Sequence, residues 1–158
     1  MKLRNYAIVL SIVIALILQI MPMPSAVSVY RPDWVFLVLG YWALALPARV
    51  NVGVAFFVGL ILDILLGTII GVHSFAMSLS IYVLAENYQR LRNYSVWQQA
   101  IVIGILGALY NLIVFWLMHL LTDVYFLLAY MWPVIASMVI WPWIFWLLRR
   151  VRRHLHLS

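Results

Sequence analysis

The chain contains no cysteine among its 158 residues, so it forms no disulfide and offers no thiolate for catalysis or metal binding. Charge is also scarce, because charged residues make up only 9% of the sequence and acidic residues number only four. An ordinary soluble domain carries about 25% charged residues, which keep its surface in water. This shortage argues against a soluble fold.

Apolar residues take the place of the missing charge. They make up 68% of the chain, against about 45–50% in a typical soluble domain. So much apolar surface has no arrangement compatible with water, which predicts a polytopic membrane protein. The net charge of +6 could indicate nucleic acid as a partner. The basic residues stand at the ends of apolar segments, however, so we expect membrane topology to explain them and no nucleic acid to bind.

Apolar segments separated by short polar connections predict an all-α fold with six transmembrane helices in a single domain, residues 1–158. The first segment resembles a secretion signal, but it is long and Pro24 is badly placed for cleavage, so we expect an uncleaved anchor. The second would span about 20 Å as a helix, short of a roughly 30 Å hydrocarbon core. It must therefore begin below the surface, thin the bilayer or lean on neighbouring helices. The predicted helices are about 6–21, 34–46, 51–66, 72–88, 97–121 and 132–148.

The basic residues predict how these helices are oriented. If the N-terminus is cytoplasmic, nine of the ten basic residues lie on the inner side and only Arg31 lies outside, as the positive-inside rule requires. Both termini should then be cytoplasmic. We expect a cytoplasmic basic surface that binds anionic membrane lipid, with docking of a cytoplasmic protein as the alternative. Its residues are Arg90, Arg92, Arg149, Arg150, Arg152 and Arg153.

One acidic residue lies inside an apolar segment. Gly59, Asp63, Gly67 and Gly71 are spaced four apart, so on a helix they share one face. Glycine on that face allows a second helix to come close, and a carboxylate there costs roughly 2.5–3.5 kcal/mol unless it faces protein or water. We expect this face to look inward, with the other segments packed around it. An interhelical hydrogen-bonded lock is the favoured role of Asp63, and a partner or ligand contact or a proton relay are the alternatives.

Two further polar positions have open interpretations. Asn111 shares a helical face with Gly104 and Ala108 and would lie beside the Asp63 face, where internal packing is the simpler role. At the start of the second segment, Asp33 and Trp34 suit a helix N-terminus at the outer interface. Together with Arg31 they could equally meet a partner.

The residues give little support for catalysis. No pair of histidines has metal-ligand spacing on a helix, and the H-E-x-x-H, G-x-S-x-G and phosphate-loop motifs are missing from the sequence. Ser78 or Ser80 with His73 is the one available combination of nucleophile and base. We therefore expect no enzyme activity, no metal and no cofactor.

Several motifs resemble the MreD family, the rod shape-determining membrane proteins of bacteria, and in particular its Gram-negative branch. The likeness covers nearly the whole chain in colinear order. The motifs are Arg31-Pro-Asp-Trp34, Tyr41-Trp-Ala-Leu-Ala-Leu-Pro-Ala-Arg49-Val-Asn51-Val-Gly53, Gly59-x-x-x-Asp63-x-x-x-Gly67, Trp97-Gln98-Gln99 and Trp141-Pro142-Trp143-Ile-Phe-Trp-Leu-Leu-Arg149.

The resemblance implies a non-catalytic scaffold of the bacterial inner membrane, within the cell-elongation complex. Such a protein binds MreC directly, and through it MreB and the peptidoglycan synthases RodA and a class B penicillin-binding protein. The family fold is thought to be similar to the substrate-binding subunit of energy-coupling-factor transporters, so a vitamin-binding transporter subunit is the alternative function. We expect partner-binding or helix-packing roles for Arg31, Asp33, Trp34, Arg49, Gly59, Asp63, Gly67 and Asn111.

Overall fold

The computed structural model describes residues 2–21, 33–45, 50–67, 69–121 and 132–154, and within these ranges it is all helical with no strand. The prediction of an all-α fold is therefore confirmed. The helices are α1 (Lys2–Ile20), α3 (Trp34–Ala45), α4 (Val52–Leu66), α5 (Val72–Glu86), α6 (Tyr88–Arg92), α7 (Val96–Leu121) and α8 (Trp132–His154).

Each of the longer helices lies on one of the apolar segments, but some boundaries differ. The segment expected to continue to Tyr88 is divided at Asn87, which ends α5 and precedes the short α6. The amide of Asn87 donates to the carbonyl of Val83 at 2.9 Å, a local bond of the kind that lets asparagine end helices. Helix α8 continues to His154, well beyond the predicted end at residue 148.

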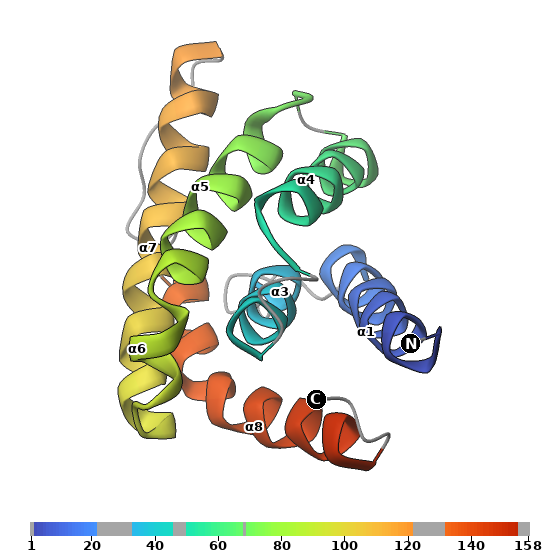
Figure 1. Cartoon of the computed structure of the whole chain (residues 1–158). Helices are drawn as coiled ribbons and strands as arrows, with labels where there is room; N and C mark the ends of the chain where they lie inside the picture. The colour runs from blue at the N-terminus through green and yellow to red at the C-terminus, as the bar shows by residue number, and fades with distance from the viewer. Residues whose placement is uncertain (1, 22–32, 46–49, 68, 122–131, 155–158) are drawn as a thin grey trace.

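The short helix α3 occupies the centre of the fold (Figure 1). Its residues Val35–Leu44 are all buried, and it packs against α1, α5, α6 and α8. The indole of Trp42 ties it to α1 by donating to the hydroxyl of Ser11 at 2.8 Å. A segment too short to span the hydrocarbon core was expected to begin below the surface, thin the bilayer or lean on neighbouring helices. In the structure it packs against neighbouring helices on all sides.

The expectation that the other helices pack around the Asp63 face is wrong. Helix α4, which carries Asp63, packs mainly on α5 and lies at the edge of the bundle (Figure 1). Its outer side is exposed and apolar, since Phe57 is 68% and Ile64 is 66% exposed. The small and polar residues on one face of α4 suggested that it was the central helix. The central helix is instead α3, which is apolar all round, the pattern of a fully buried helix.

Helix α8 bends partway along its length (Figure 1). Pro142 lies inside this helix, where it removes one backbone hydrogen bond and crowds the preceding turn. The bend carries the arginine-rich end of α8 beneath α3, which places Arg149 and Arg152 near the C-terminal end of that helix.

Two helices, Val96–Leu120 and Trp132–Arg153, are long and apolar enough to cross a membrane. The other apolar helices in the described ranges have 10–17 residues. Helix length and composition thus give two candidate spans, and the six-span topology stays a prediction.

Candidate functional site

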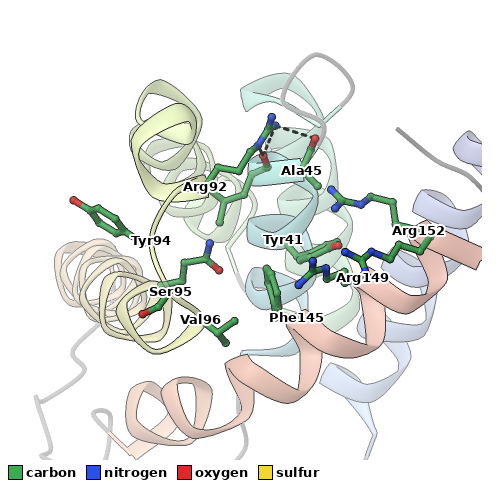
Figure 2. Close-up of a pocket in the computed structure, with 12 residues that line it drawn as sticks. Tyr41, Ala45, Arg92, Tyr94, Ser95, Val96, Phe145, Arg149 and Arg152 are labelled. Carbon is green, nitrogen blue, oxygen red and sulfur yellow. Dashed lines mark hydrogen bonds between the residues drawn. The ribbon is translucent and has the colours of Figure 1, made fainter.

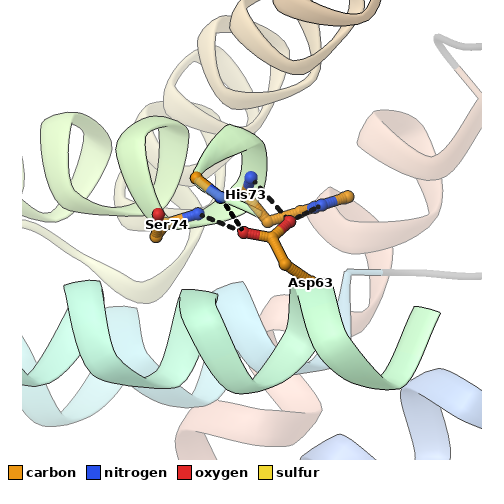
Figure 3. A network of polar contacts seen from close by, with 4 residues as sticks. Asp63, His73 and Ser74 are labelled. Carbon is orange, nitrogen blue, oxygen red and sulfur yellow. Dashed lines mark hydrogen bonds and ion pairs between the residues drawn. The ribbon is translucent and has the colours of Figure 1, made fainter. Parts of the chain in front are cut away.

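Asp63 joins the end of α4 to the start of α5 (Figure 3). Its side chain is fully buried. One carboxylate oxygen accepts from the backbone N–H of Gly71 at 2.9 Å and of Ser74 at 3.4 Å. The other accepts from the backbone N–H of His73 at 3.0 Å and lies 2.8 Å from that residue's ring Nδ1. Beside a carboxylate, the ring nitrogen is the donor.

This contact supplies the cap that α5 otherwise lacks. Gly71, at the N-cap position, has no side chain to accept from the first N–H groups of the helix. The carboxylate of Asp63 accepts from those groups, and its negative charge also suits the positive end of the helix dipole. The geometry is that of an interhelical lock, the favoured sequence interpretation.

Gly67 and Gly71 do not belong to the helical face on which the spacing placed them. Both have left-handed backbone angles, with φ of 70° and 106°, in the turn between α4 and α5, and no atom lies within 4 Å of where a Cβ would be built on either. Their role is to reverse the chain, because only glycine adopts these angles without strain. The four-residue spacing therefore does not mark one helical face, because Gly67 and Gly71 are required by the turn.

Gly59 does meet another helix closely. A Cβ built on it would lie 2.4 Å from Cα and 2.8 Å from the backbone N of Ser74 on α5. Since these are backbone atoms, they cannot rotate away. Gly59 therefore sets the distance between α4 and α5, which in turn lets Asp63 reach its donors.

Asn111 does not contact the Asp63 face as expected, because its amide donates to the carboxylate of Asp33 at 3.0 Å. The backbone N–H of Asp33 in turn donates to the buried hydroxyl of Ser137 on α8 at 3.1 Å. The neighbouring residue Tyr110 approaches the Asp63 site instead, with its ring 6.2 Å from that of His73. Neighbouring positions on a helix point about 100° apart, so Tyr110 faces the Asp63 site while Asn111 faces the start of α3.

The remaining predicted residues occupy varied positions. Trp34 is half-buried and packs against the core, while Arg31 and Arg49 lie outside the described residues. Ser78, the candidate nucleophile, donates its hydroxyl to the carbonyl of Ser74 in its own helix at 2.6 Å, and the ring of His73 is held by Asp63. Both groups therefore have structural partners.

The pairing of Asp63 with His73 was missed by sequence reasoning. Its signal was an acid ten positions before a histidine, across a turn containing two glycines. In the described parts of the chain, no group of three possible metal ligands occurs.

A cavity of about 900 Å³ lies at the other end of the fold, where α3 ends, α7 begins and α8 ends (Figure 2). We call it the arginine cavity. Polar lining comes from all of these elements, and Figure 2 shows Arg149 and Arg152 beside Tyr41. The described lining residues are Tyr41, Leu44, Ala45, Arg92, Tyr94, Ser95, Val96, Gln99, Phe145, Arg149, Arg152 and Arg153.

The arginines of the predicted basic surface have different surroundings. Arg92 donates to the last carbonyls of α3, at 2.7 and 3.1 Å to Leu44 and 3.0 Å to Ala45, so it caps the central helix. Arg152 lies 6.0 Å from the ring centre of Tyr41, and Arg149 lies 5.8 Å from that of Phe145. The exposed Arg90 and Arg150 do not line the arginine cavity.

Comparison with known proteins gives a match over nearly the whole chain. The family model for rod shape-determining protein MreD matches residues 2–151. The rod shape-determining protein MreD of Haemophilus influenzae is 36% identical over 155 residues, which cover 98% of this chain and 96% of that protein. No solved structure matches.

Proposed function

Because the chain belongs to the MreD family of rod shape-determining proteins, we propose that it is a non-catalytic, multi-pass protein of the bacterial inner membrane that binds MreC. In this proposal both termini are cytoplasmic and six helices cross the bilayer, in an arrangement similar to the substrate-binding subunit of energy-coupling-factor transporters. MreB, RodA and a class B penicillin-binding protein belong to the same complex and are reached through MreC. The role in cell shape follows from family membership, and the contact with MreC is the proposal.

The use of the buried polar groups supports a scaffold. Asp63 and Asn111, the deepest polar side chains expected from the sequence, both bond to groups of the same chain. Buried polar groups that are satisfied internally hold a fold in one arrangement. Helices held in one arrangement suit a protein that acts by presenting a binding surface to a partner.

The outer face of α4 is the surface we propose for the transmembrane helix of MreC. This helix packs mainly on α5, and its other side exposes a row of large apolar residues. A single-pass apolar helix would find close van der Waals contact there, which drives helix association in lipid. The exposed residues are Phe56, Phe57, Ile61, Ile64 and Leu65.

Site-specific photocrosslinking tests this surface. A benzoylphenylalanine replacing Phe57 on α4 should crosslink to MreC in living cells. The matched control replaces Ile105 on α7, which is exposed to a similar degree, 65% against 68%, with α5 lying between the two helices (Figure 1). MreC crosslinked equally from both positions would contradict the assignment to α4, and failure of MreC to co-purify from native membranes would overturn the proposed partnership.

The alternative function, a vitamin-binding transporter subunit, gains no support from the comparisons. It would need a polar pocket around Asp63, and that carboxylate is instead fully buried against the start of α5. We therefore keep the scaffold as the proposed function.

A further inference from the structure

The arginine cavity has the charge of an anion site. Four arginines and no carboxylate are found among its described lining residues. The ion pair present in the described ranges joins His73 to Asp63 elsewhere in the fold, so Arg149 and Arg152 have no carboxylate partner there. Positive groups gathered on one helix end repel one another, and a bound anion would relieve that repulsion.

Two buried polar atoms in the same cavity have no partner among the described residues. They are the hydroxyl of Tyr41 and the side-chain oxygen of Gln99, in residues only 2% and 4% exposed. The amide nitrogen of Gln99 is already used, since it donates to the carbonyl of Leu91 at 3.0 Å. Buried polar atoms are nearly always hydrogen-bonded, so among the described residues these two atoms are open to a bound group.

These two unpaired atoms indicate the chemistry of a group that would pair with both. A tyrosine hydroxyl can donate to a phosphate oxygen, whereas the amide oxygen of Gln99 only accepts and needs a donor such as a hydroxyl. Arginines bind phosphate well, because their planar donors match its oxygens. The ligand should therefore carry a phosphate and, close to it, a hydroxyl.

We propose that the arginine cavity binds the headgroup of an anionic phospholipid. The phosphate lies between Arg149, Arg152 and the hydroxyl of Tyr41, and a headgroup hydroxyl donates to Gln99. Apolar lining from Val96 and Phe145 accommodates the carbon atoms that follow the phosphate. Phosphatidylglycerol has this combination, whereas the ammonium group of phosphatidylethanolamine would be repelled by the arginines.

This proposal goes beyond the role in cell shape and does not depend on MreC. It also differs from general attraction to an anionic surface, which acts on every basic residue close to that surface. A specific site requires that substituting a residue that lines the cavity weakens lipid binding more than substituting its neighbour on the same helix.

Native mass spectrometry of the purified full chain tests the site. The chain in detergent, supplied with phosphatidylglycerol or phosphatidylethanolamine, should retain phosphatidylglycerol about tenfold better. Tyr41→Phe, which removes one hydroxyl and keeps the ring, should weaken retention about tenfold or more, as for loss of a bond to a charged group. Arg152→Gln should weaken it about tenfold, and the control Arg150→Gln, which removes the same charge from an exposed position on α8, less than twofold.

Two outcomes would overturn the proposal. Equal losses for Arg150→Gln and Arg152→Gln would show diffuse surface attraction. Displacement of the lipid by millimolar inorganic phosphate would assign the cavity to a soluble phosphate compound. If Arg152→Gln fails to fold, Tyr41→Phe decides the matter, provided that its melting temperature matches the parent, because unchanged retention in that variant contradicts the site. The crosslinking of MreC is measured separately in cells, so either proposal can fail alone.

Discussion

At the scale of single residues, Asp63 stabilises the start of α5 from the end of the preceding helix. Three backbone N–H groups and one ring nitrogen meet its two oxygens. This arrangement accounts for an acid in an apolar segment, because the carboxylate replaces its lost hydration with fixed donors.

Asp63→Ala should lower the free energy of unfolding by about 1.5–3 kcal/mol, the range for losing hydrogen bonds to a charged group. Unfolding in mixed micelles of increasing denaturing detergent measures this. Ser80→Ala is the control, because Ser80 is also buried but its hydroxyl has no partner among the described residues. If Asp63→Ala is as stable as Ser80→Ala, the proposed role of Asp63 as an interhelical lock is contradicted.

Gly59→Ala should separate α4 from α5, because the added methyl group would meet the backbone of Ser74. Overpacking of this kind costs about 1–3 kcal/mol, and we expect lower stability and poor complementation of rod shape. Gly107→Ala is the matched control, since its Cβ would have only an ordinary contact of 3.8 Å with Phe36. Normal cell shape with Gly59→Ala would show that close approach is not required.

These residues also show how far the sequence could predict the site. The position of Asp63 inside an apolar segment correctly predicted that it needs internal partners, and the glycine four residues before it correctly predicted close packing at Gly59. Spacing could not distinguish Gly59, which is within a helix, from Gly67 and Gly71, which are in the turn. It also could not give the rotation of α7 about its axis. Asn111 was therefore expected to face the Asp63 site, whereas Tyr110 faces it and Asn111 bonds to Asp33.

At the scale of elements, the central helix α3 depends on contacts at both of its ends. Its beginning is fixed by the bond from Asp33 to Ser137 on α8, and its last carbonyls are bound by Arg92 from the region of α6. The last carbonyls of a helix have no partner within the helix, so a side chain that binds them stabilises that end. The shortness of this segment predicted dependence on neighbours, although not which ones.

Arg92→Ala should therefore destabilise the protein by about 1.5–3 kcal/mol through the loss of these charged bonds. Arg90 is exposed on the same short helix, as Arg92 is, so Arg90→Ala removes the same charge while leaving the bonds to α3 in place. It should change stability by less than about 0.5 kcal/mol. Thermal unfolding followed by circular dichroism in detergent compares the two. Equal melting temperatures would contradict the capping role of Arg92.

At the scale of the whole molecule, the positive-inside rule gives a topology that can be measured directly. The sequence has no native cysteine, so single cysteines can be introduced without removing others. Ile70→Cys, in the exposed turn after α4, should react with a membrane-impermeant maleimide in intact spheroplasts. Asn93→Cys, exposed between α6 and α7, should react only after permeabilisation, and the reverse pattern would invert the topology.

The enclosure of α3 has a consequence for biogenesis. A nascent chain emerges N-terminus first, yet α3 is buried against α8, which follows all the other described helices in the chain. The contacts that enclose α3 are complete only after α8 has been synthesised, so the earlier helices first form an incomplete assembly. Chains that stop before α8 should therefore be substrates for membrane quality-control proteases even though most of their helices have been synthesised.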